Sequence, residues 1–123
     1  MRIKEFDIIR LLQANRYALA GLRDAFRSQV AVRQEVLIIL VMSPVALWLG
    51  ENGVERALLI GALFLILITE LLNAAIETTV DRIGTEHHEL SRKAKDMAAA
   101  AVLVSLIMAG IVWLLILFDK LAQ

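Results

Sequence analysis

The chain is short, strongly apolar and balanced in charge. It has 123 residues, 59% of them hydrophobic, and a mean hydropathy of +0.71, which is more apolar side chain than one small soluble core could bury. Composition therefore indicates a single integral membrane domain; thirteen basic and thirteen acidic residues argue against a nucleic-acid partner, and the lack of cysteine excludes disulfides and thiolate metal sites.

Residues 6–27 predict an amphipathic helix. On a helical wheel its apolar side chains fall on one face, whereas Arg10, Tyr17 and Asp24 fall on the opposite face. Three arginines follow the boundary between the two faces: Arg16, Arg23 and Arg27. This arrangement is typical of a helix that lies in the membrane interface with its arginines near anionic headgroups.

Three apolar stretches predict membrane-spanning helices over about 30–50, 54–81 and 95–119. The third contains an uncharged run, 97–118, that as a helix reaches roughly 33 Å, enough to cross the hydrocarbon core. Backbone groups in lipid must be hydrogen-bonded within the protein, so each stretch is expected to be helical. The expected fold is all-α, with one surface helix and three transmembrane helices.

Loop charges predict the orientation of these helices. The segment before the first span carries seven basic residues: Arg2, Lys4, Arg10, Arg16, Arg23, Arg27 and Arg33. The 81–96 loop carries four: Arg82, Arg92, Lys93 and Lys95. The loop between the first two spans has only Arg56, beside two glutamates. Because basic loops stay inside, the N-terminus and the 81–96 loop are expected in the cytoplasm.

Four polar side chains follow one face of the second span near its cytoplasmic end. Glu70, Asn73, Glu77 and Asp81 fall within an arc of roughly 80° on the helical wheel. A polar seam that joins helices could account for one of them. Three carboxylates this close would repel one another unless a cation or a basic partner lay among them. A hard cation such as Mg²⁺, shared with substrate phosphates, would suit this oxygen-rich face.

The loop that follows, "DRIGTEHHELSRKAKDM", places further charges beside this face: Glu86, Glu89, Lys93, Lys95 and Asp96. Its lysines could hold phosphates, or its basic residues could simply set the topology. His87 and His88 are adjacent, which is not a metal-ligand spacing, so they are expected to line the loop. The chain has neither a P-loop motif nor GxGxxG, which excludes those two kinds of nucleotide site.

The segments "ELLNAAIE", "VDRIGTEHHELS" and "AKDMAAAAVL" closely resemble the bacterial integral-membrane diacylglycerol kinase family, and "RYALAGLRDAF" and "VRQE" resemble its N-terminal part. The resemblance implies ATP-dependent phosphorylation of the primary hydroxyl of diacylglycerol, which gives phosphatidic acid. It also implies a multi-pass protein of the bacterial inner membrane, assembled as a homotrimer with composite active sites between subunits.

The resemblance also implies roles for individual residues. Glu70 would be the general base and Asn73 would shape its site, while Glu77 would bind the Mg²⁺ that bridges the ATP phosphates. The remaining ATP contacts would come from Arg10, Tyr17, Gln29, Glu86, His87, His88, Lys95 and Asp96. The lipid would lie beside Glu70 and against the surface helix and the first and third spans, at Asn15, Ala18, Leu19, Arg23, Ala31, Trp48, Arg56, Ala99 and Trp113.

Two positions depart from the family pattern. Gln29 stands where the family has a second metal-binding glutamate; it keeps an oxygen ligand but loses the charge, so Mg²⁺ affinity is expected to fall. Either the site tolerates one fewer carboxylate or this form is impaired, and a kinase assay separates these cases. His87 stands where a tyrosine is expected, which is a milder change.

Two other functions fit the same residues. The chain could phosphorylate another membrane alcohol, such as undecaprenol, on the same scaffold; a comparison of lipid substrates separates these cases. It could instead be a non-enzymatic channel or transporter subunit lined by the face that carries Glu70. The lack of inverted repeats or paired discontinuous helices argues against a transporter.

Overall fold

The structure is a computed structural model that describes residues 3–123, with side chains from Asp7 onward. It contains four helices, namely α1 (Ile3–Ser28), α2 (Val30–Leu49), α3 (Gly53–Ile83) and α4 (Glu89–Leu121), and no strand within this described part. The predicted all-α class, with three apolar helices after an N-terminal helix, is confirmed. Arg2 and the side chain of Lys4, which contributed to the predicted orientation, lie outside the described part.

The helices α2, α3 and α4 are each long and apolar enough to cross a membrane. α3 has 31 residues and α4 has 33, so they extend about 46 Å and 50 Å at 1.5 Å per residue. Both therefore exceed the ~30 Å hydrocarbon core. Both also continue past the predicted spans toward their shared loop, α3 to Ile83 and α4 back to Glu89.

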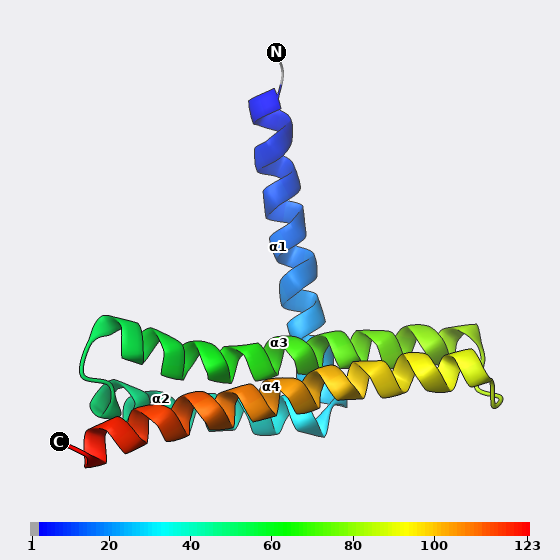
Figure 1. Cartoon of the computed structure of the whole chain (residues 1–123). Helices are drawn as coiled ribbons and strands as arrows, with labels where there is room; N and C mark the ends of the chain where they lie inside the picture. The colour runs from blue at the N-terminus through cyan, green and yellow to red at the C-terminus, as the bar shows by residue number, and fades with distance from the viewer. Residues whose placement is uncertain (1–2) are drawn as a thin grey trace.

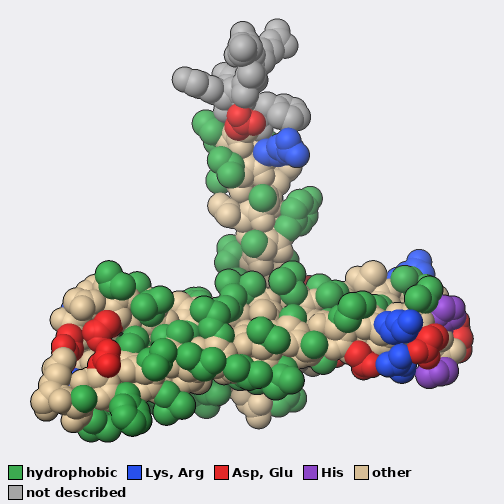
Figure 2. All heavy atoms as spheres, in the orientation of Figure 1, with side chains coloured by type: hydrophobic (Ala, Val, Ile, Leu, Met, Phe, Trp, Pro, Cys, Tyr) green, Lys and Arg blue, Asp and Glu red, His purple; other side chains and the backbone are tan. Residues whose placement is uncertain are grey.

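α3 is the centre of the bundle. It packs against α2 and α4, which contact each other little (Figure 1). Small side chains, among them Ala46, Ala62 and Ala109, are buried between the helices and let the backbones approach closely. Most other apolar side chains of the bundle are exposed, such as Leu40 at 67%. Figure 2 shows charged side chains at the two ends of the bundle and an apolar middle, as expected for a protein that spans a membrane.

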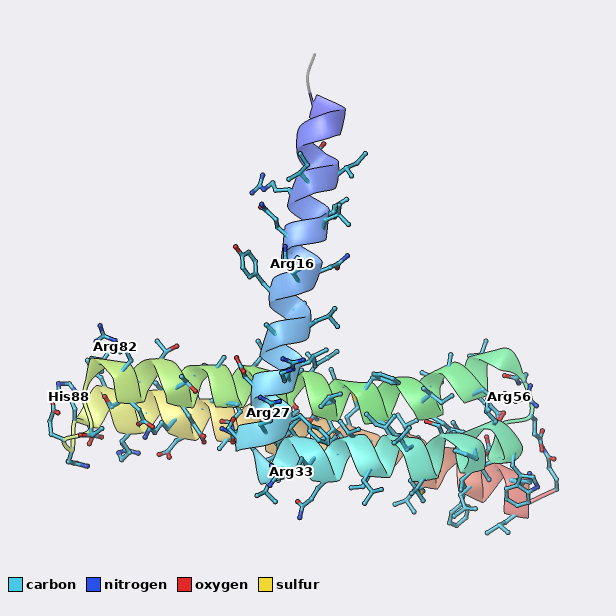
Figure 3. All side chains as sticks on the ribbon, turned by 180° about the vertical axis from the view of Figure 1, so that it is seen from behind. Arg16, Arg27, Arg33, Arg56, Arg82 and His88 are labelled. Carbon is cyan, nitrogen blue, oxygen red and sulfur yellow. The ribbon has the colours of Figure 1, made fainter. Side chains whose placement is uncertain are left out.

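α1 stands away from the bundle, across its long axis, and joins α2 part-way along α3 (Figures 1 and 3). Arg33 holds this corner, because its Nη1 donates to the carbonyl oxygens of Phe26 and Arg27, each at 2.9 Å. The basic side chain thereby satisfies carbonyls at the C-terminal end of α1. This direction of α1, across the axis of the bundle, is compatible with the surface location that its amphipathic pattern predicts.

At the end of the bundle away from the loop between α3 and α4, side chains from α3 and α4 cover the last turn of α2. The Arg56 Nε donates to the Leu47 carbonyl at 3.1 Å, and the Lys120 Nζ donates to the Trp48 carbonyl at 3.1 Å. The Lys120 ammonium also lies 3.9 Å from the centre of the Trp48 ring. These contacts satisfy carbonyls that the end of a helix leaves unpaired.

Candidate active site

The polar face of α3 is a row of side chains that repeats every four residues: Thr69, Asn73, Glu77 and Asp81. Within it the Asn73 Nδ2 donates to the Glu77 Oε1 at 3.4 Å, and the Asp81 Oδ1 accepts from the Lys95 Nζ at 2.7 Å. Glu70 is half-buried and flanks the row at its deeper end. Because α3 is unbroken through Ile83, the spacing keeps these side chains on one side of the helix, as the sequence predicts.

Glu35 of α2 is the acidic residue that sequence reasoning did not place in the site. Its side chain is only 6% exposed, and its Oε1 accepts no hydrogen bond within the described structure. It lies close enough to Glu70 for the two carboxylates to repel each other. A charge within an apolar span was the available signal, because such residues are rare in membranes and usually functional.

The structure supplies oxygen ligands for a cation, but not a complete set. The Asn73 Oδ1 is buried and accepts no hydrogen bond. The amide nitrogen of the same side chain donates to the Glu77 carboxylate, so the two side chains are neighbours. Among the described residues, no group of three or more acidic, histidine or cysteine side chains could hold a metal ion. These two residues therefore fit Mg²⁺ in its common form, in which one or two carboxylates act together with substrate phosphates and waters.

The loop between α3 and α4 encloses a recess of about 330 Å³ that gathers four of the predicted ATP contacts, namely Glu86, His87, His88 and Lys95. Its lining also includes Arg92. The His88 Nδ1 accepts from the backbone N–H of Leu90 at 3.1 Å and caps α4, so the recess opens at a helix N-terminus. Such an end favours anions.

Asp96 lies about two turns beyond the His88 cap of α4. Its Oδ2 accepts from the Arg92 Nη1 at 2.7 Å, and the same guanidinium also contacts Glu89. Arg92 therefore joins Asp96 to the wall of the recess.

Other predicted residues lie elsewhere in the single chain. Arg10, Tyr17, Asn15, Leu19 and Arg23 are exposed on α1, away from the recess. Trp48, Arg56 and Trp113 lie toward the opposite end of the bundle, where the Trp113 Nε1 donates to the Leu59 carbonyl at 3.2 Å. In Figure 3, Arg56 marks that end, whereas Arg82 and His88 mark the end with the recess. Ala31 is half-buried in α2, and Ala99 is exposed on α4.

Gln29 is the residue between α1 and α2. Together with Ala18 it lines a groove of about 740 Å³, whose wall on α3 includes Ala74 and Ala75. Gln29 therefore lies beside the stretch 71–79 of α3, but Glu77 is not among the residues that line this groove, so no contact joins the two predicted metal ligands within the described chain. Its backbone is extended, with φ −116° and ψ 112°, and its side chain makes no capping hydrogen bond to α2.

Comparison with known proteins assigns the chain to a family. A model of the prokaryotic diacylglycerol kinases matches residues 16–117. The chain belongs to the prokaryotic diacylglycerol kinase family. It is 44% identical to a diacylglycerol kinase of Haemophilus influenzae, over 94% of this chain and 98% of that protein. It is 46% identical to one of Escherichia coli (89% and 90%) and 50% identical to one of Pseudomonas aeruginosa (88% of each chain).

The part that matches the diacylglycerol kinases contains the polar face of α3, Glu35, Gln29 and the whole recess. Arg10 and Asn15 precede it. The buried carboxylates and the anion-favouring recess therefore both lie in the segment that defines the family.

Proposed function

We propose that the chain transfers the γ-phosphate of ATP to the primary hydroxyl of diacylglycerol, with Glu70 as the general base. The observation that carries this proposal is the polar face of α3, which leads from a half-buried carboxylate to a recess at the N-terminus of α4. A lipid hydroxyl and a soluble nucleotide could meet along such a face. Membership of the diacylglycerol kinase family supports this choice of substrates.

The depth of Glu70 supports its role. α1 marks the level of the membrane surface, and its junction with α2 lies beside residues 71–79 of α3. Glu70 is thus just inside this level, whereas Asp81 and the loop lie beyond it. The headgroup hydroxyl of diacylglycerol lies at the interface, within reach of a carboxylate one or two helical turns inside.

In the proposed reaction the lipid hydroxyl gives its proton to Glu70 as its oxygen attacks the γ-phosphorus. The bond between that phosphorus and the β–γ bridging oxygen breaks, so ADP and phosphatidic acid form. Phosphoryl transfer requires mainly positioning and charge neutralisation. Glu77, with Gln29, would hold Mg²⁺, which neutralises phosphate charge, while Asn73 would shape the site of Glu70. Lys95 and Arg92 would hold phosphate oxygens from the recess.

The proposed assembly is a homotrimer with active sites shared between subunits. Arg10 and Tyr17 are exposed on α1, with Tyr17 at 75%, and in one chain they do not reach the recess. A neighbouring subunit could bring its own recess to them. The exposed apolar side chains along α2, α3 and α4 offer surface for such contacts as well as for lipid.

The proposed location is the bacterial inner membrane, with the N-terminus and the loop between α3 and α4 in the cytoplasm. The basic residues near α1 and in the loop favour this orientation. It also gives the recess access to cytoplasmic ATP.

The test is a transfer assay with labelled ATP, using the purified full chain in mixed micelles that contain diacylglycerol or undecaprenol. We expect phosphatidic acid from diacylglycerol and at most weak labelling of undecaprenol. A strong preference for undecaprenol would contradict the assigned substrate. Glu70→Gln should lower the rate of phosphoryl transfer by at least about 100-fold, while the oligomer remains folded. Near-normal turnover of this variant would mean that Glu70 is not the general base.

A further inference from the structure

A pair of hydroxyl groups joins α3 to α4 within the apolar part of the bundle. The Thr69 Oγ1 and the Ser105 Oγ are 3.0 Å apart, and Ser105 is only 3% exposed. Each oxygen also lies near a carbonyl of its own helix, the Ile66 carbonyl at 2.9 Å and the Val102 carbonyl at 2.7 Å. The two hydroxyl protons have two carbonyl and two hydroxyl oxygens as acceptors, so one hydroxyl can donate across the interface while the other donates to its own helix.

The hydroxyl pair lies at the deep end of the polar row of α3, next to Glu70. Thr69 directly precedes Glu70 and is the deepest member of the polar row of α3. The shallow end of the same row is joined to α4 by Asp81 and Lys95, at 2.7 Å. Glu70, Asn73 and Glu77 therefore lie between two polar contacts that both lead to α4. Together these contacts oppose rotation and sliding of α3 against α4 along the segment that carries the chemistry.

The surroundings of the pair are apolar. A buried cluster of Ala62, Ile66 and Ala109 packs α3 against α4. A groove of about 390 Å³, whose lining includes Leu65, Met97 and Ala101, lies beside the pair. Apolar contacts of this kind are not directional. The hydrogen bond is directional, and water cannot readily replace it at this depth.

We propose that Thr69 and Ser105 are positioning residues for phosphoryl transfer. The hydroxyl pair fixes the rotation of α3 on α4 and thereby the direction of the Glu70 carboxylate toward the lipid hydroxyl. This proposal rests on the assignment of Glu70 as the general base. Reaction rates depend steeply on such alignment, since a misplacement of about 1 Å can cost about 100-fold.

The experiment uses the full chain with four changes: Thr69→Val, Ser105→Ala, the double change, and Thr69→Ser, which keeps the hydroxyl. Thr69→Val and Ser105→Ala should each lower kcat about threefold to tenfold, which equals about 0.6 to 1.4 kcal/mol at 1.36 kcal/mol per tenfold. The KM for ATP should not change. The double variant should be no slower than the slower single variant, because either change removes the same bond. Thr69→Ser should retain nearly full kcat.

Two controls separate positioning from general stabilisation. Lys120→Met removes a contact at the opposite end of the bundle, so it should lower the unfolding temperature without lowering kcat per folded protein. If Thr69→Val and Ser105→Ala behave in the same way, the pair only stabilises the bundle and the proposal is overturned. Additive losses of kcat in the double variant would overturn it too.

The Glu70→Gln variant separates the assignment of Glu70 as the general base from the positioning role of Thr69 and Ser105. If this variant is inactive while Thr69→Val keeps full kcat, the base assignment stands and only the positioning role fails. If Glu70→Gln is active, the base assignment fails and the positioning role fails with it.

Discussion

Lys95 of α4 and Asp81 of α3 form an ion pair, with 2.7 Å between Nζ and Oδ1, near the loop that joins the two helices. Both side chains are about half exposed, and exposed pairs contribute little to stability. We expect its main effect to be on binding: Asp81 orients the Lys95 ammonium at the edge of the recess, where a phosphate would compete with Asp81 for that ammonium.

Lys95→Met should therefore raise the KM for ATP by about tenfold, because a charge-assisted phosphate contact is lost. Asp81→Asn should have a smaller effect, since it leaves the ammonium in place. Initial rates at varied ATP, with diacylglycerol saturating, measure both values. An unchanged KM for ATP in Lys95→Met would remove Lys95 from the proposed ATP site.

Gln29→Glu should lower the Mg²⁺ concentration that gives half-maximal activity, by several-fold. The change adds a carboxylate at a position that is predicted to bind Mg²⁺, and hard cations bind carboxylates more strongly than amides. Gln34→Glu is the matched control, because Gln34 is exposed on α2 and should leave the Mg²⁺ dependence unchanged. If Gln29→Glu required more Mg²⁺ than the unchanged chain, residue 29 would not belong to the metal site.

Glu35→Gln should stabilise the protein by about 1 kcal/mol. Glu35 is a buried carboxylate with an unpartnered oxygen beside Glu70, and an amide of the same shape removes the repulsion. Thermal unfolding in detergent measures the change, with Glu51→Gln as the control at an exposed carboxylate. A lower unfolding temperature for Glu35→Gln would mean that the charge of Glu35 is stabilised by a group outside the single chain.

Lys120→Met should destabilise the protein by about 1 kcal/mol, because α2 loses a carbonyl partner and a cation–π contact at Trp48. The lipid KM should stay unchanged, because Lys120 is not itself a predicted lipid contact. A raised KM for diacylglycerol would contradict this expectation and would mean that Lys120 holds the predicted lipid contact Trp48 in its binding position.

Hydropathy was sufficient to predict the helices of this chain, because lipid permits few other backbone conformations. The polar face of α3 was also predictable, since the directions of Glu70, Asn73 and Glu77 depend only on the geometry of one helix. The loop residues Glu86, His87 and His88 are neighbours in sequence, and they also lie together in the recess.

Contacts between helices were not predictable in this way. That Glu35 lies beside Glu70, and that Thr69 meets Ser105 across 36 positions, depends on how the helices pack. Sequence spacing on a single helix contains no such information. The distance of Arg10 and Tyr17 from the recess has a similar origin, because it follows from the angle at which α1 leaves the bundle.

That angle is set at a single residue. Only Gln29 separates α1 from α2, and Arg33 holds the last carbonyls of α1. In the proposed orientation α1 rests on the lipid surface and α2 is embedded in the bilayer, so a thinner or thicker membrane would tilt one helix against the other about residue 29. Such a tilt would move Gln29 along the wall of α3 that includes Ala74 and Ala75. Membrane thickness is therefore expected to change the position of a residue that is predicted to bind Mg²⁺.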